Sequence, residues 1–170
     1  RAWKSLAPDL RRVAVLTGPG LQGLMQESRA AAGAHQIDLV HVPVRSDKET
    51  LFAYKRIASQ VQGLWLVPDN RVLSSETIRE LLAHSVKEGK QVAASSQELL
   101  AFGALLSASS DYGDIAGRVL ARARQSRGRN DVPGPALEPL QRAQINVSAR
   151  MLEQFNLRLP PALQGGLYAP

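Results

Sequence analysis

Residues 63–70 form the stretch that most restricts how this chain can fold. Four consecutive large apolar residues, Leu64 to Val67, follow Gly63 and precede the turn residues Pro68-Asp69-Asn70. An apolar run of this length between turn residues is typical of a strand that is buried on both faces, as in the centre of a parallel sheet. Such a strand needs helices over both faces of its sheet, so the stretch predicts an α/β fold.

Strand-like and helix-like segments alternate on both sides of this stretch. Ser46-Asp47-Lys48-Glu49 and Ser95-Ser96-Gln97-Glu98 both match the capping box, in which Ser and Glu side chains satisfy amides at a helix start. Ser74 or Ser75 is expected to cap another helix. We expect strands at 12–16, 37–44, 63–67, 91–94, 104–108 and 144–147, and helices at 2–7, 21–32, 46–57, 74–86, 97–103, 111–124 and 148–155.

This alternation, with its short connections, predicts a three-layer, doubly wound, mainly parallel sheet of Rossmann-like type with strand order 2-1-3-4-5. The 170 residues are enough for a single α/β domain and too few for two full lobes. Hydrophobic residues make up 44% and charged residues 21% of the chain, which is typical of a globular protein.

The region after the fifth strand contains a helix and then an irregular tract. Asp111 is expected to cap this helix, with three apolar residues on its inward side: Ile115, Val119 and Leu120. Whether residues 104–127 pack on this sheet or lean toward another part of the protein stays open. Residues 125–140 combine charged residues with Gly and Pro, which predicts a flexible crossing segment. Leu159-Pro160-Pro161 predicts an extended tail.

The positive charge of the chain, +6 in total, is concentrated between residues 118 and 150. This region has seven arginines against Asp131 and Glu138, a local excess of +5. It contains no Phe, Tyr or Trp, whereas a nucleic-acid surface usually interleaves aromatic side chains with its basic residues. We therefore interpret it as a solvated helix end and linker, and expect no nucleic-acid partner.

The sequence contains neither a candidate membrane span nor a cysteine. No apolar run approaches the length of a membrane span, and residues 1–5 contain no apolar signal core. The start at Arg1 instead of Met indicates a processed or engineered start, and a removed signal or lipoprotein anchor stays open as one explanation. The absence of cysteine excludes disulfides and thiol chemistry.

The carboxyl ends of the expected strands are where a ligand site is predicted. In open α/β sheets, ligands bind beyond these ends, at the point where the chain changes direction across the sheet. The rule selects five loops: 17–22, 45–47, 68–72, 95–97 and 109–112.

The loop Gly18-Pro19-Gly20-Leu21-Gln22-Gly23 matches the dinucleotide pattern G-x-G-x-x-G. That pattern also requires an acidic residue at the end of the second strand, where this chain has Val44 and Arg45. We therefore predict a turn that needs glycine for its backbone angles, and no nucleotide cofactor. The free amides at residues 20–22 favour a small anion, most economically a ligand carboxylate.

No catalytic or metal-binding constellation is evident. The histidines at 35, 41 and 84 lack ligand spacing, so no metal site is expected. No G-x-S-x-G pattern accompanies the loop serines, and Asp69, Asp111 and Asp114 are best explained as turn and cap residues. We predict that the chain is not an enzyme. Tyr112 is the aromatic residue best placed to touch a ligand, with the packing of a helix face as the alternative.

Several segments, taken in order, resemble one family. They are 63–70, 72–78, 91–97, 103–112, 144–150 and the ending Leu157-Arg158-Leu159-Pro160. Together they are similar to the ABC-transporter substrate-binding proteins of the tryptophan/tyrosine-binding type, which have the type I periplasmic-binding-protein fold. The resemblance extends from about Arg11 to Pro161.

The resemblance implies a two-lobed protein that closes over a small ligand and delivers it to a membrane permease, in the periplasm or anchored to the envelope. This chain would be the second lobe. Two positions depart from the family: its asparagine-containing turn after the first strand is Gly-Pro-Gly here, and its acidic residue after the fourth strand is Gln97. The resemblance places ligand-binding residues in four of the five loops that the strand-end rule selects: Gly18, Pro19, Gly20, Pro68, Asp69, Asn70, Ser95, Ser96, Gln97, Asp111 and Tyr112.

Two functional hypotheses follow. In the first, the chain is a lobe of a solute-binding protein for an amino-acid-like molecule, and its partners are a first lobe and an ABC permease. In the second, an isolated lobe has lost transport and acts as an interaction or regulatory module, whose partner is another protein or a second copy in a homodimer.

Overall fold

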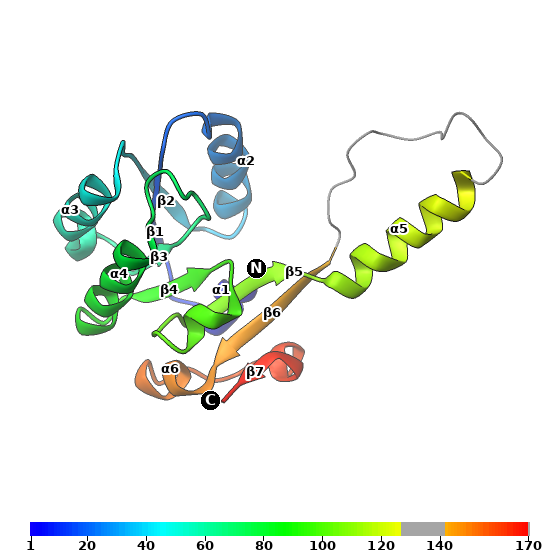
Figure 1. Cartoon of the computed structure of the whole chain (residues 1–170). Helices are drawn as coiled ribbons and strands as arrows, with labels where there is room; N and C mark the ends of the chain where they lie inside the picture. Colours follow the sequence, from blue (N-terminus) through cyan, green and yellow to red (C-terminus); the bar gives the residue numbers. More distant parts are fainter. Residues whose placement is uncertain (127–141, 170) are drawn as a thin grey trace.

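The computed structural model describes residues 1–126 and 142–169. In this part of the chain one sheet has seven strands in the order β2-β1-β3-β4-β5-β6-β7 (Figure 1). The strands are β1 Arg12–Thr17, β2 Asp38–Pro43, β3 Gly63–Trp65, β4 Gln91–Ala94, β5 Leu106–Ser110, β6 Ala143–Ser148 and β7 Leu167–Tyr168. The α-helices are α1 Ala2–Leu6, α2 Gln22–Gly33, α3 Asp47–Ile57, α4 Ser75–Lys87, α5 Tyr112–Ser126 and α6 Ala149–Gln154. Three short 3₁₀ helices lie at Ala58–Gln60, Gln97–Leu100 and Pro161–Gly166.

The first five strands pair in parallel and in the predicted order, which confirms the doubly wound, mainly parallel sheet. Two further strands extend it beyond β5. β6 pairs with β5 in the antiparallel direction, and β7 pairs in parallel with β6.

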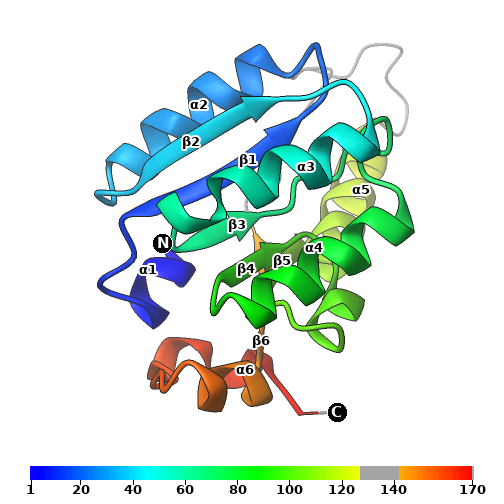
Figure 2. The same ribbon diagram turned by 90° about the vertical axis from the view of Figure 1, so that its left-hand side faces the viewer.

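Helices cover both faces of the sheet, as the apolar run in β3 requires. α3 and α4 lie on one side, and α2 lies on the other (Figure 2). β1 shows the consequence, because Ala14 and Leu16 belong to the cluster under α3 and α4 whereas Val13 and Val15 belong to the cluster under α2. A third cluster joins α1 and α6 to the ends of β4 and β5.

Two boundaries and the chain end differ from the prediction. β3 pairs only over Gly63–Trp65, although Leu66 and Val67 after it remain buried. β5 begins at Leu106 and not at the predicted residue 104. The two buried residues before Leu106 follow a tight turn in which Gly103 has a φ of 109°. The prediction of an extended tail at 159–161 is wrong beyond Pro160, because Pro161 starts a 3₁₀ helix that leads into β7. Proline is well suited to that first helical position.

The inward position predicted for Val119 and Leu120 is not found on this sheet, and Ile115 is half-buried. α5 points away from the rest of the described chain (Figure 1), and the side chains of Val119 and Leu120 are 61% and 57% exposed. α1 and α6 cover the ends of β4 and β5, and no described residue of α5 belongs to that cluster. α5 extends to Ser126, so the first two residues of the predicted flexible segment are helical, and the rest of that segment, 127–140, lies outside the described residues.

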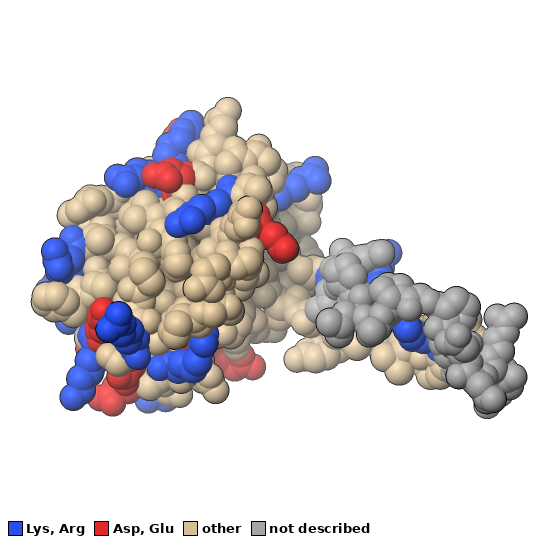
Figure 3. All heavy atoms as spheres, turned by 90° about the horizontal axis from the view of Figure 1, so that it is seen from above, with Lys and Arg blue, Asp and Glu red and all other residues tan. Residues whose placement is uncertain are grey.

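Charge on the lobe is dispersed. Seen from above, Lys and Arg atoms are scattered around the lobe and mixed with Asp and Glu, and no single basic patch forms among the described residues of that face (Figure 3). The basic region between residues 118 and 150 is described only in part, because residues 127–141 lie outside the described residues, so its interpretation as a solvated helix end and linker stays a prediction.

Candidate functional site

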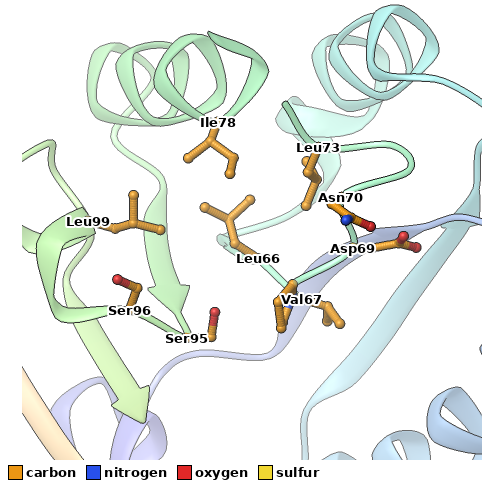
Figure 4. A pocket seen from close by; sticks show the side chains of 10 residues that line it. Leu66, Val67, Asp69, Asn70, Leu73, Ile78, Ser95, Ser96 and Leu99 are labelled. Carbon is orange, nitrogen blue, oxygen red and sulfur yellow. The ribbon is translucent and has the colours of Figure 1, made fainter. Parts of the chain in front are cut away.

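A pocket of about 520 Å³ lies at the carboxyl ends of β3 and β4 and is called the β3–β4 pocket here. Its floor and walls are mainly apolar, with Leu66, Leu73, Ile78 and Leu99 around it (Figure 4). Five predicted ligand-binding residues line it: Pro68, Asp69, Asn70, Ser95 and Ser96. Its volume lies in the range of small-molecule sites, and apolar walls with a few polar groups are typical of such sites.

Three local features of the sequence place these residues together. β3 stops pairing at Trp65, so the chain from Leu66 to Asn70 leaves the sheet over its edge. The Ser74 side chain accepts a hydrogen bond from the Thr77 amide at 3.1 Å, and this predicted cap starts α4 so that Ile78 faces the pocket. β4 is parallel to β3, so Ser95 and Ser96, which follow it, emerge at the same edge.

Asp69 has a charged partner and is almost fully buried, with 6% of its surface exposed. Its carboxylate accepts hydrogen bonds from Arg71 Nε at 2.7 Å and Arg71 Nη2 at 2.9 Å, and from the Gly18 amide at 2.9 Å. The hydrogen bonds from the Arg71 side chain hold the pKa of Asp69 below its ordinary value, and the Gly18 amide adds to this effect. The carboxylate points away from Ile78 and Leu99 (Figure 4), so Asp69 turns toward β1 and not toward the centre of the pocket.

Asp69 and Arg71 also hold the loop from Gly18 to Gly20 in place. Arg71 Nη1 donates a hydrogen bond of 2.6 Å to the Pro19 carbonyl, and a Cβ atom at Gly18 would lie 3.0 Å from the Asp69 carboxylate. Gly20 has a φ of 90°, a region that favours glycine. Gly20 therefore serves the tight turn that was predicted. Gly18 serves a close approach that was not predicted, and its amide donates a hydrogen bond to Asp69 of the same chain.

The capping box predicted at 95–98 is wrong. The segment Gln97–Leu100 is a 3₁₀ helix without a side-chain cap, and the Ser96 hydroxyl bonds to the Glu98 carboxylate instead of a backbone amide. The short helix explains this outcome, since it offers fewer free amides than an α-helix start. The other capping box is confirmed, with the Ser46 hydroxyl accepting from the Glu49 amide at 3.3 Å.

Six predicted residues lie outside the pocket lining: the three of the loop from Gly18 to Gly20, and Gln97, Asp111 and Tyr112. Gln97 is exposed on the short helix after β4. Asp111 accepts hydrogen bonds from the amides of Gly113 and Asp114, which confirms its role as a cap of α5. Tyr112 is 77% exposed at the start of that helix. The structure thus gathers the residues after β3 and β4 but leaves those after β5 apart.

Arg71 is the residue of this region that the sequence prediction missed. It lies in the loop 68–72 that the strand-end rule selected, but no pattern signalled its contacts. The signal, in retrospect, is an arginine two residues after a buried aspartate at a strand end, a spacing that allows the side-on pair seen here.

The described residues of the chain offer no candidate metal site. They contain no group of three or more His, Cys, Asp or Glu residues that could hold a metal ion. His41, one of the three histidines, is hydrogen-bonded to the Thr17 hydroxyl at 2.8 Å. In the part of the chain that the structure describes, every helix is too short or too polar to cross a membrane.

Comparison with known proteins gives one family match. A family model described as "ABC transporter substrate binding protein" matches residues 2–151. A search of curated protein sequences finds no match.

Solved structures of three proteins have a similar fold. A conserved domain protein of Vibrio cholerae is 19% identical with a TM-score of 0.71, over 97% of this chain and 56% of that one. An ABC domain of Streptococcus pneumoniae in complex with L-Trp is 15% identical with a TM-score of 0.73, over 97% and 57%. A ligand-free, open substrate-binding protein of Clostridium difficile with adhesive properties is 16% identical with a TM-score of 0.66, over 96% and 55%. The chain therefore spans little more than half the length of each of these proteins.

Proposed function

Because the chain belongs to the ABC transporter substrate-binding protein family, we propose that it is one lobe of a solute-binding protein and that the β3–β4 pocket is one wall of the ligand cleft. The observation that carries the proposal is this pocket, which lies at the strand ends where ligands of open α/β sheets bind. It is lined by five of the residues selected from the sequence.

The ligand that suits this wall is a small molecule with an apolar body. Leucine and isoleucine side chains surround most of the pocket, and the Asn70 amide with the hydroxyls of Ser95 and Ser96 supplies the polar contacts. An amino-acid-like solute with an aromatic or branched side chain fits this chemistry, and the fold neighbour from Streptococcus pneumoniae is in complex with L-Trp. Gly18 to Gly20, Gln97, Asp111 and Tyr112 remain proposed contacts, which closure of the cleft would have to bring to the ligand.

The proposed role is delivery of the solute to an ABC permease in the periplasm or at the envelope. Binding of this kind needs no catalytic group, in keeping with a pocket whose polar lining consists of amide and hydroxyl groups and one paired carboxylate. The family supports a binding protein over an enzyme.

A complementary lobe would supply the second wall and cover α5. Tyr112, Ile115, Val119 and Leu120 recur at helical spacing on one side of α5, and three of them are strongly exposed. The fold neighbours contain a further part of similar size that this chain does not match. We expect the amides of α5 to exchange hydrogen slowly when that lobe is present and quickly without it. Equal exchange in both samples would contradict this placement.

Ligand binding should be visible in the thermal stability of the chain. At about ten times the dissociation constant, a ligand that binds only the native state adds about 1.4 kcal/mol, which corresponds to roughly 3–6 °C in Tm for a chain of this size. We expect such a rise with aromatic or branched amino acids in a thermal-shift titration. Leu99→Trp should abolish it, since the larger side chain fills the pocket.

Leu24→Trp is the matched control for this experiment. Leu24 is 42% exposed on α2 and lies outside the pocket lining, so the same substitution there should leave the response unchanged. The proposal fails if no amino acid at millimolar concentration raises Tm, or if Leu99→Trp responds as the parent chain does.

A further inference from the structure

We propose that Arg71 is the receptor for a carboxylate on the ligand and that this wall does not recognise a ligand ammonium group. The inference rests on the proposed function, since it concerns the ligand of the same site. It names a specificity-determining residue that neither the sequence patterns nor the pocket lining identified, and it narrows the substrate class to carboxylates.

The first step concerns the acidic groups of the site. Asp69 is the one carboxylate among the lining residues of the pocket, and a ligand ammonium would need it as a counter-charge. Its side chain is 2% exposed and is held in a side-on pair by Arg71 and by the Gly18 amide. Glu98, the next acidic residue along the chain, is exposed and lies outside the pocket lining. The one carboxylate that lines the pocket is therefore already paired with a cation of the chain itself.

The second step concerns the donors that remain on Arg71. A guanidinium has five N–H groups. Three are used, two on Asp69 and one on the Pro19 carbonyl, which leaves one on each Nη nitrogen. The Arg71 side chain is 49% exposed, so these donors can be reached. Carboxylates are the groups that arginine binds best, through paired charge-assisted hydrogen bonds.

The third step concerns the surroundings of these donors. Arg71 Nη1 would lie 3.8 Å from a Cβ atom at Gly20, so the guanidinium extends over the turn that leads into α2. The first turn of α2 has no acidic residue, and its N-cap makes no side-chain hydrogen bond. No side chain of this turn therefore competes with a ligand carboxylate for Arg71. The apolar body of the ligand would lie in the β3–β4 pocket, with Asp69 between the two parts of the site.

A matched set of ligands tests the inference by calorimetry. L-phenylalanine, 3-phenylpropionate and 2-phenylethylamine share one apolar body and differ only in their charged groups. We expect the two carboxylates to bind within about threefold of each other and the amine at least tenfold more weakly. L-leucine, 4-methylpentanoate and 3-methylbutylamine repeat the comparison with a branched body.

Two variants of Arg71 make the test specific. Arg71→Lys keeps the charge and can still pair with Asp69, but it loses the planar fork, so carboxylate binding should weaken about tenfold while Tm changes little. Arg71→Gln leaves the Asp69 charge without its cation, so the amine should become the best ligand of the set. Arg12→Lys is the control, because the Arg12–Asp38 pair is exposed. This substitution should leave the affinities for all three ligands unchanged.

The outcomes separate this inference from the proposed function. If none of the six compounds binds, the proposed solute site fails and the inference with it. If compounds bind but the amine equals or exceeds the carboxylate, the pocket stands and the role of Arg71 is refuted. The role of Arg71 is also refuted if L-phenylalanine binds and 3-phenylpropionate does not. Unchanged carboxylate affinities in Arg71→Lys would refute it as well.

Discussion

Asp69→Ala should lower the free energy of unfolding by about 3 kcal/mol. The substitution leaves the buried Gly18 amide without its acceptor, which alone costs about 1–3 kcal/mol. It also removes the carboxylate that accepts two hydrogen bonds from Arg71. Because Arg71 is half exposed, water can take over part of its solvation, and the loss should stay below that of a fully buried ion pair. Urea unfolding monitored by circular dichroism measures the change.

Asp38→Ala is the control for this prediction. The Arg12–Asp38 pair has a similar separation, 3.2 Å, but its side chains are 46% and 64% exposed. Exposed pairs contribute about 0–1 kcal/mol, so Asp38→Ala should have a small effect. Comparable losses in the free energy of unfolding of the two variants would contradict the buried hydrogen bonds assigned to Asp69.

The Asp69 contribution should depend on pH in a defined direction. Its pKa is lowered in the folded chain, mainly by the hydrogen bonds from the Arg71 side chain. A lowered pKa contributes stability above the unfolded-state value, which is about 3.9 for aspartate, and the contribution is lost as pH falls through the folded-state value. The stability difference between the parent chain and Asp69→Asn should therefore be constant from about pH 7 to 5 and shrink below about pH 4.

Most of the sheet could be predicted from the sequence because each strand carries its own signal. The run from Leu64 to Val67 and the Ser46 capping box are local patterns, and the order of the first five strands follows from short connections. β7 could not be predicted in the same way. It has two residues, and it forms because β6 presents an open edge to the chain end.

The sequence patterns of α5 and Asp69 were themselves interpreted correctly. The structure adds which surface or group each patterned residue contacts. The apolar spacing of Val119 and Leu120 correctly indicated an amphipathic helix, but spacing cannot say whether the apolar side meets this sheet or another surface. Asp69 is similar. It was recognised as a turn residue at a strand end, while its pairing with Arg71 and the Gly18 amide depends on two loops that are far apart in the sequence.

Leu64→Ala should be the most damaging single substitution considered, with a loss of about 4 kcal/mol. Leu64 is fully buried in β3, in register with Ala14 of β1 and Val92 of β4. Truncating it removes buried apolar area and leaves a cavity that strands paired on both sides cannot easily close. Leu120→Ala is the matched control, because it truncates the same side chain at a position that is 57% exposed. It should cost less than about 0.5 kcal/mol in urea unfolding. Similar losses for the two variants would mean that α5 packs on this sheet, and the surface that we assign to a complementary lobe would then not exist.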